Sequence, residues 1–277
     1  MYEGVLNLFK NTGTKISESV GEIYGTDEAS EIIGNGAGGD KTKKIDKVAE
    51  DIVISEISKS YDDFCLISEE LGIKFFGKAT EDNCNKFFFA DPIDGSNNAT
   101  RGIPMFATSL AFSTSQYIDD IKVGYVRNIF GEEYYASKGK GAYKAHKINN
   151  ETDKHDKILM NSNGDNIEFL GVEFAPYGKN LDEISKIMQL AKHYRTVGSI
   201  ALGLCYVASN ALDAYIDLRP PRILDLTAAK LIIEEAGGLC FLSKENLRVD
   251  TTTKTNLIAG NRNVVEKIRK RLLFSTP

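Results

Sequence analysis

The sequence changes abruptly from apolar to polar within Phe87-Phe88-Phe89-Ala90-Asp91-Pro92-Ile93-Asp94-Gly95-Ser96. The aromatic run has the length and bulk of a buried strand, and the proline and glycine predict a turn directly after Asp91. Asp91, Asp94 and the Ile93 carbonyl can then point to one side, which suits a hard cation with oxygen ligands. Gly95 and Ser96 follow at a predicted helix start, where unpaired backbone N–H groups favour an anion such as phosphate. The segment therefore predicts a combined metal and phosphate site.

The composition indicates an ordinary globular protein. The chain has 277 residues, of which 42% are hydrophobic and 26% charged, so one large or two small domains can each bury a core. The formal net charge is −5 and no dense Lys/Arg cluster occurs, which argues against a nucleic-acid or membrane partner. The four cysteines are scattered, no apolar run approaches the roughly 20 residues that span a bilayer, and no export signal begins the chain. We therefore expect a soluble cytoplasmic protein with reduced thiols.

Apolar spacing predicts alternating helices and strands. Helices are expected at 3–20, from Lys43, and at 181–192, 199–208, 226–236 and 264–273. Strands are expected at 64–67, 87–89, 105–113, 122–126, 133–136, 194–197, 214–218 and 257–259, with an antiparallel sheet in the first half. The glycine-rich segment 34–39 predicts a mobile loop that closes over a substrate, or a floppy connection.

Four acids stand at the ends of strongly apolar elements. Glu69 follows the strand at 64–67, Asp91 and Asp94 follow the strand at 87–89, and Asp225 precedes the helix at 226–236. Asp225 alone could be a helix N-cap, and Glu69 could be a solvated surface residue. If the apolar elements pack into one core, however, the four carboxylates meet at its edge and repel one another without cations.

Four blocks carry a resemblance to a known family. They are Asp40…Thr42…Asp46, Ser68-Glu69-Glu70, Asp91-Pro92-Ile93-Asp94-Gly95-Ser96 and Asp225-Leu226-Thr227-Ala228-Ala229…Glu235-Ala236-Gly237-Gly238. In this order, and over nearly the whole chain, they resemble the inositol monophosphatase and fructose-1,6-bisphosphatase superfamily. The resemblance implies an α/β (α+β) fold, a layered α-β-α-β-α sandwich, and hydrolysis of a sugar or inositol phosphate with Mg²⁺ and water. It further implies a single unit, 1–277, with the metal site in about 1–145 and the substrate residues in about 146–277. A homodimer or a dimer of dimers is also implied.

The resemblance implies a role for each matching residue. One Mg²⁺ would be held by Glu69, Asp91 and the Ile93 carbonyl, and a second by Asp91, Asp94 and Asp225. A third, weaker ion would contact Glu69 through water, and Mn²⁺ could substitute. Catalysis would use Asp46, Glu69 and Ser96, where Asp46 and Ser96 orient the attacking water. Substrate would bind Gly95, Ser96, Arg195, Ser199, Asp217 and Arg219.

The substrate is less closely defined than the chemistry. Arginine suits a second phosphate, which favours a bisphosphate, although Arg195, Arg219 and Arg222 could instead be surface or interface residues. The segment Leu212-Asp213-Ala214-Tyr215-Ile216-Asp217-Leu218-Arg219-Pro220 is most similar to the archaeal branch with activity on fructose 1,6-bisphosphate and inositol 1-phosphate. Leu224, where inositol monophosphatases usually carry an aromatic residue, argues against strict inositol specificity. The alternatives are a 3′-phosphoadenosine 5′-phosphate nucleotidase and a non-catalytic metal-binding interaction protein.

Overall fold

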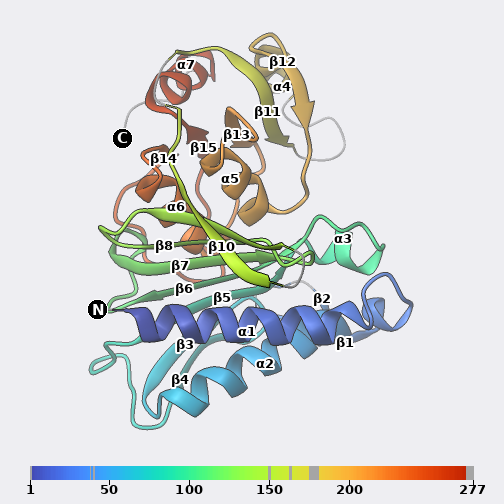
Figure 1. The fold of residues 1–277 in the computed structure, drawn as a ribbon, viewed down its shortest axis with the longest axis vertical. Coiled ribbons are helices and arrows are strands. Elements are labelled where there is room, and N and C mark those ends of the chain that lie inside the picture. Colours follow the sequence, from blue (N-terminus) through green and yellow to red (C-terminus); the bar gives the residue numbers. More distant parts are fainter. Residues whose placement is uncertain are drawn as a thin grey trace.

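The chain forms five stacked layers of alternating helices and sheets (Figure 1). The computed structural model describes residues 2–37, 39, 41–148, 151–161, 164–174 and 181–272. From one side to the other, the layers are α1 with α2, a first sheet, α5 with α6, a second sheet, and α4 with α7. This arrangement confirms the expected α-β-α-β-α sandwich.

The first sheet has the strand order β10-β9-β8-β7-β6-β5-β3-β4 in the described chain. Neighbouring strands are antiparallel except for β3 and β5, which are parallel. The predicted strands of the first half are all present, while β4, β9 and β10 were not predicted. The bounds are β3 Phe64–Ser68, β4 Gly72–Phe76, β5 Phe87–Asp94, β6 Ala107–Ser113, β7 Ile121–Asn128, β8 Glu133–Ser137, β9 Ala142–Ile148 and β10 Glu151–Ile158. Because β10 lies in this sheet, the first sheet includes residues up to Ile158.

Helices α1 (Glu3–Gly21) and α2 (Lys44–Ser60) cover the outer face of the first sheet. Their apolar residues recur every three or four positions, so each helix buries one stripe against the sheet. The contact is rich in aromatic rings, with Phe88 of β5 packed edge-on to Phe9 and Phe64. This layer holds the start of α2, and with it Asp46, beside the end of β5.

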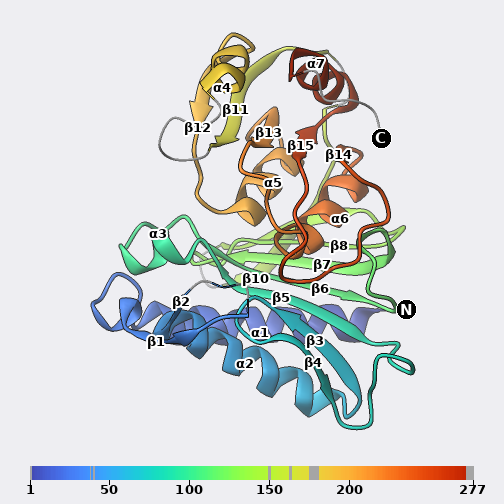
Figure 2. The ribbon, with the colours of Figure 1, turned by 180° about the vertical axis from the view of Figure 1, so that it is seen from behind.

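Helices α5 (Ile200–Ala208) and α6 (Thr227–Glu235) lie between the two sheets in both views (Figure 1, Figure 2). Both are apolar around most of their circumference because sheet covers them on either side. Gly124 of β7 lets α6 approach closely: a Cβ at this position would lie 2.5 Å from the carbonyl oxygen of Ala228. One hydrophobic cluster thereby includes residues of both sheets.

The second sheet has the order β12-β11-β13-β15-β14, with α4 and α7 on its outer face. Its elements are β11 Ile167–Glu173, α4 Leu181–Ile187, β12 Ala191–Arg195, β13 Ala214–Asp217, β14 Leu239–Leu242, β15 Leu257–Gly260 and α7 Arg262–Leu272. The helix predicted at 181–192 is therefore too long, because its last residues join β12. Gly237, with a φ of 90°, ends the α6 segment as predicted.

Short elements connect these layers. They are the 3₁₀ turns η1 Glu28–Ser30, η2 Ile118–Asp120 and η3 Leu224–Leu226, the helix α3 Ser96–Thr100, and the hairpin of β1 Ile32–Asn35 with β2 Lys41–Lys43. Part of the segment 34–39, predicted as a loop, is therefore strand. Residues 38 and 40 lie outside the described residues. Within the described ranges, no helix combines the length and the hydrophobicity needed to cross a membrane.

Candidate active site

A bulge at the end of β5 brings its two aspartates to one face. The strand runs to Asp94 instead of turning after Asp91, and its pairing with β6 shifts register between these two residues. In a regular strand, residues three apart point to opposite faces, and one extra residue returns the second to the same face. Pro92 sits in the irregular step, where a strand tolerates proline, and its carbonyl accepts a hydrogen bond from Thr108 Oγ1 at 2.9 Å. Asp91 and Asp94 consequently line one cavity.

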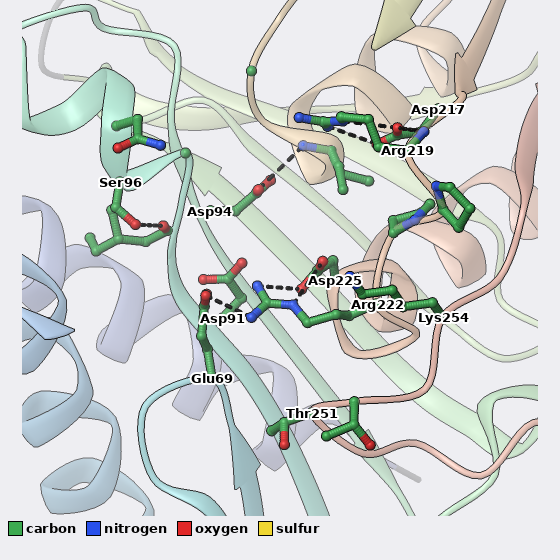
Figure 3. A pocket seen from close by; sticks show the side chains of 18 residues that line it. Glu69, Asp91, Asp94, Ser96, Asp217, Arg219, Arg222, Asp225, Thr251 and Lys254 are labelled. Carbon is green, nitrogen blue, oxygen red and sulfur yellow. Dashed lines mark hydrogen bonds and ion pairs between the residues drawn. The ribbon is translucent and has the colours of Figure 1, made fainter. Parts of the chain in front are cut away.

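This cavity, about 570 Å³, lies where the end of β5 faces η3 and the segment after β13 (Figure 3). Most of the predicted site residues line it, and they are Glu69, Asp91, Ile93, Asp94, Gly95, Ser96, Asp217, Arg219 and Asp225. Residues that were not predicted complete its wall, including Asn97, Arg222, Thr251, Thr252 and Lys254. The cavity thus has both acidic and cationic side chains in its lining.

Asp94 is fixed by the beginning of α5. Its Oδ2 accepts hydrogen bonds from Ser199 Oγ and Ala201 N, both at 2.6 Å, and its Oδ1 accepts one from Ile200 N at 3.2 Å. Burial raises the pKa of Asp94 to about 7, although these hydrogen bonds act in the opposite direction. Ser199 is itself buried and caps α5 by accepting from Leu202 N. Ser199 therefore contacts Asp94 directly, and its contact with substrate stays a prediction.

Asp46 lies behind the cavity wall, at the start of α2. Its Oδ2 accepts a hydrogen bond from Lys43 N at 3.2 Å, as an acid at the third helical position does in a capping box. Burial raises its pKa to about 7, the charge of Glu70 adds to this increase, and a hydrogen bond with Ser96 opposes it. Ser96 therefore lies close enough to Asp46 to affect its pKa, while its Oγ donates to the Ile93 carbonyl at 3.3 Å; the joint action of the pair on a water stays a prediction.

Glu70 ties the glycine-rich segment to this region. Thr42 Oγ1 donates a short hydrogen bond to Glu70 Oε2, and Ala37 N donates to the Glu70 carbonyl at 3.0 Å. Gly36 lies close to the same side chain: a Cβ there would lie 2.5 Å from Glu70 Oε2, so the Glu70 carboxylate would have to shift. Where it is described, the segment therefore packs against the acid next to Glu69. Its closure over a substrate stays a prediction.

Asp225 does not cap α6. It lies in η3, and the N-cap position of α6 belongs to Leu226 without a side-chain hydrogen bond. Instead Asp225 faces Arg222: Nε donates to Oδ2 at 3.3 Å and Nη2 lies 3.2 Å from Oδ1. Arg222 Nη1 also lies 2.7 Å from Glu69 Oε1. The surface or interface location considered for Arg222 is therefore wrong, because its side chain is 16% exposed and faces the acid cluster.

Arg219 is held by the second sheet. Its Nε and Nη2 donate to the two oxygens of Asp217, at 3.0 and 2.7 Å, and Glu173 Oε2 lies 3.9 Å from Nη2. The guanidinium is thereby fixed on the cavity wall, with its side chain 38% exposed. Asp217 is buried behind it and positions it.

Arg195 lies away from the cavity, whereas Asp46 and Ser199, which do not line it either, are buried next to residues that do. Arg195 ends β12, its guanidinium stacks 5.2 Å from the Phe169 ring centroid, and its Nη1 donates to the Tyr194 carbonyl. The sequence offered a signal for Arg222, a basic residue three positions before Asp225, but none for Thr251, Thr252 or Lys254. These three lie in the segment between β14 and β15, which reaches the cavity by pairing with the residues around Arg222.

The donor set fits a divalent metal ion in its chemistry. Burial raises the pKa of Asp91 well above its usual range and that of Asp225 to about 6, so the ionised carboxylates lack compensating charge. Asp225 Oδ1 is buried without an aligned hydrogen-bond donor. Within the described ranges, however, no three acidic, histidine or cysteine side chains converge closely enough to hold one ion as they stand. The guanidinium of Arg222 lies between Glu69 and Asp225 instead (Figure 3).

Comparison with known proteins places the chain among phosphatases. The model of the inositol monophosphatase family matches residues 1–275. The fructose-1,6-bisphosphatase/inositol-1-monophosphatase of Methanothermobacter thermautotrophicus is 32% identical over 289 residues, which cover 98% of this chain and 99% of that protein. The bifunctional NADP phosphatase/NAD kinase of Methanococcus maripaludis is 33% identical over 292 residues, covering 99% of this chain but 48% of that protein.

The fold comparison agrees with the sequence comparison. A solved inositol monophosphatase–fructose 1,6-bisphosphatase superposes with a TM-score of 0.78 at 28% identity, covering 95% of this chain and 96% of that one. The family match, the sequence similarity over nearly the full length and the fold all indicate the same family. The chain therefore belongs to the inositol monophosphatase family of phosphoric monoester hydrolases.

Proposed function

We propose that the protein is a Mg²⁺-dependent phosphomonoesterase that hydrolyses fructose 1,6-bisphosphate and inositol 1-phosphate. One observation carries the proposal: a single cavity is lined by Glu69, Asp91, Asp94 and Asp225 together with the cationic side chains of Arg219, Arg222 and Lys254. Buried acids of this kind require cations, and the cationic side chains suit an anionic substrate.

The residues divide into a metal part and a phosphate part. Glu69, Asp91, Asp94, Asp225 and the Ile93 carbonyl would hold two Mg²⁺ ions, with a third ion beside Glu69. Bound there, the ions would supply positive charge to the phosphoryl group and lower the pKa of the attacking water. The backbone N–H groups of Gly95 and Ser96, on the same wall, would bind the phosphate.

Asp46 and Ser96 would position the water and take up its proton. The Asp46 pKa of about 7 suits a general base at neutral pH. Ser96 Oγ donates its single O–H to the Ile93 carbonyl at 3.3 Å. For the transfer, this O–H would turn to the Asp46 carboxylate and pass its proton there as the oxygen takes a proton from the water, and no covalent intermediate is needed.

A second anionic group of the substrate would contact Arg219 and Lys254. Asp217 fixes the Arg219 fork on the cavity wall, which lowers the entropy that substrate binding must remove. Arg195 is withdrawn from the proposed substrate site because it packs on Phe169. The expected homodimer and the cytoplasmic location accompany the proposal as predictions.

One relative supports a second candidate substrate. The protein of Methanococcus maripaludis aligned over 99% of this chain is named an NADP phosphatase/NAD kinase. NADP carries a phosphate monoester, and the 570 Å³ cavity is open enough to admit part of a nucleotide. Hydrolysis of NADP would use the same metal ligands and the same water.

A substrate panel tests the proposal. Phosphate release is measured from fructose 1,6-bisphosphate, inositol 1-phosphate, NADP and 3′-phosphoadenosine 5′-phosphate, with Mg²⁺ and with EDTA. Mg²⁺-dependent release that is fastest from the first two supports the proposed substrates. Fastest release from NADP would indicate an NADP phosphatase, and fastest release from the adenosine bisphosphate would indicate a nucleotidase. No phosphate release from any of the four, by a folded protein that binds Mg²⁺, would favour a non-catalytic role.

A further inference from the structure

We propose that the guanidinium of Arg222 acts as a protein-borne cation of the acid cluster, which a divalent ion must displace from Asp225 before the cluster is fully loaded. The inference rests on the proposed function in one respect, that these carboxylates hold metal ions. It adds the order in which the metal ions bind, and it names Arg222 as a residue that controls their affinity.

The contacts of Arg222 differ between its two acidic partners. Toward Glu69 the contact uses one oxygen, Oε1, at 2.7 Å from Nη1. Toward Asp225 it uses both: Nη2 lies 3.2 Å from Oδ1, and Nε donates to Oδ2 at 3.3 Å. One carboxylate oxygen of Glu69 therefore stays available to a metal ion, whereas both oxygens of Asp225 face the guanidinium (Figure 3).

The charge of Arg222 is permanent at this position. Burial alone would lower its pKa, but the carboxylates of Asp225 and Glu69 raise it above that of a free arginine. The side chain is 16% exposed and that of Asp225 is 8% exposed, so solvent screens the pair weakly. A metal ion that uses Asp225 has to compete with a fixed positive charge for the same two oxygens.

Fewer aligned hydrogen bonds hold Arg222 than hold its neighbour Arg219: among the described contacts, one joins Arg222 Nε to Asp225 Oδ2, at 3.3 Å. Arg222 Nη1 and Asp225 Oδ1 are both buried without an aligned hydrogen-bond partner. Arg219, in contrast, forms two aligned hydrogen bonds with Asp217, at 3.0 and 2.7 Å. Contacts between Arg222 and its acids therefore depend on charge more than on hydrogen-bond geometry, and a divalent cation can replace that charge.

Two classes of metal site follow. An ion held by Glu69, Asp91 and the Ile93 carbonyl can bind while Arg222 stays on Asp225. An ion that needs Asp225 binds only at the expense of the Arg222 contacts, so it is the weaker of the two. Arg222 thereby keeps the acid cluster neutralised when metal is scarce.

Binding of Mn²⁺ to the metal-stripped full chain tests this, with free Mn²⁺ measured by electron paramagnetic resonance. Wild type is compared with Arg222→Gln, with Arg222→Lys, and with Arg219→Gln, which removes the same charge from the same cavity. In Arg222→Gln we expect the weaker class of site to tighten at least about tenfold, or about 1.4 kcal/mol. Arg219→Gln is expected to change it less than about threefold, or about 0.7 kcal/mol.

The stability of the metal-free protein gives an independent result. In EDTA, Arg222→Gln is expected to unfold at a lower temperature than wild type, because the acids lose their counter-charge, and excess Mn²⁺ should remove the difference. Arg222→Lys keeps the positive charge, so its weaker site should stay within about threefold of wild type, or about 0.7 kcal/mol. If Arg222→Gln does not fold in EDTA, its Mn²⁺ affinity is measured on protein folded with Mn²⁺ and then dialysed to low free Mn²⁺.

Two outcomes would overturn the inference. One is unchanged or weaker Mn²⁺ binding in folded Arg222→Gln. The other is equal tightening in the Arg222 and Arg219 variants, which would show a general effect of cavity charge. A wild-type protein that binds no Mn²⁺ would instead overturn the proposed function, so the two failures are distinguishable.

Discussion

At the scale of single residues, Asp94 has two structural roles. It is a proposed metal ligand, and it also accepts three hydrogen bonds at the start of α5. Asp91, at the other side of the bulge, is also a proposed metal ligand. Burial disfavours its ionised form most, and the negative charges of Glu69 and Asp94 disfavour it further. The two aspartates therefore predict different consequences of the same substitution.

Asp94→Asn and Asp91→Asn are both expected to abolish turnover. In EDTA, Asp94→Asn should also lower the free energy of unfolding by about 1–3 kcal/mol, because the amide cannot accept all three hydrogen bonds. Asp91→Asn should leave that free energy unchanged or raise it, because it removes a repelling charge. Urea unfolding of the two variants in EDTA measures the difference. Equal losses of stability would contradict the capping role of Asp94.

The raised pKa values predict how metal stabilisation depends on pH. Burial raises the pKa of Asp94 to about 7 and that of Asp225 to about 6, above the usual value of about 3.9. Their protonated forms stabilise the metal-free fold fully below about pH 4, and this contribution is lost as the pH rises to 6–7. Mg²⁺ needs the ionised forms. The increase in melting temperature on adding Mg²⁺ should therefore be small at pH 5 and largest at pH 8; an increase that is constant over this range would contradict the account.

At the scale of elements, the sequence predicted most helices and strands because their signals are local. Helices α1 and α2 each bury one face, and α5 is buried almost all round. Both patterns can be recognised from the spacing of apolar residues in the sequence. Pro92 was less informative. Proline after Asp91 predicted a turn, but pairing with β6 keeps the chain in the sheet as a bulge. Tertiary pairing thus decided a position where the local signal was ambiguous.

Asp225 illustrates a second limit of local signals. An aspartate directly before an apolar helix predicts an N-cap, but the chain enters α6 through η3, so the carboxylate turns to Arg222. The 3₁₀ turn depends on backbone contacts with residues far along the chain, such as the hydrogen bond from Ile223 N to the Thr253 carbonyl at 2.8 Å. No short-range pattern reports such a contact.

The close approach of β7 and α6 predicts that replacing glycine by alanine changes stability in opposite directions at Gly124 and Gly4. Gly124→Ala should destabilise the protein by about 1–3 kcal/mol, because a Cβ would lie 2.5 Å from the carbonyl of Ala228. Gly4→Ala is the matched control: it lies in α1 with no atom within 4 Å of its Cβ, and should stabilise by about 0.4–1 kcal/mol. Thermal unfolding of both variants measures this. A neutral Gly124→Ala would show that the layers can separate without cost.

At the scale of the whole molecule, the cavity joins residues from distant parts of the chain. Glu69 follows β3 and Asp91 and Asp94 lie in the last part of β5, all in the first sheet, while Asp217 ends β13 of the second. The sequence could predict the convergence of the acids, because each ends an apolar element that must be buried. It could not predict the cationic side chains of the cavity, since Lys254 reaches the cavity only through a bridge between its backbone and that of Arg222.

Arg195 shows the same limit from the other side. Its place in the second half of the chain suggested a substrate contact, but β12 is the edge strand of the second sheet, and the side chain packs on Phe169. The sequence therefore predicted the acids of the site more accurately than its arginines. A carboxylate that must be buried has few alternatives to a metal site, whereas an arginine has many partners.

The central claim is metal-dependent hydrolysis by the cavity acids, and one measurement tests it most directly. Phosphate release from fructose 1,6-bisphosphate is followed as a function of Mg²⁺ concentration at pH 8, for wild type and Asp91→Asn side by side. The account predicts no release in EDTA, saturable release by wild type as Mg²⁺ is added, and none by Asp91→Asn at any Mg²⁺ concentration while its circular dichroism stays that of wild type. Release by wild type in EDTA, or turnover retained by folded Asp91→Asn, would contradict it.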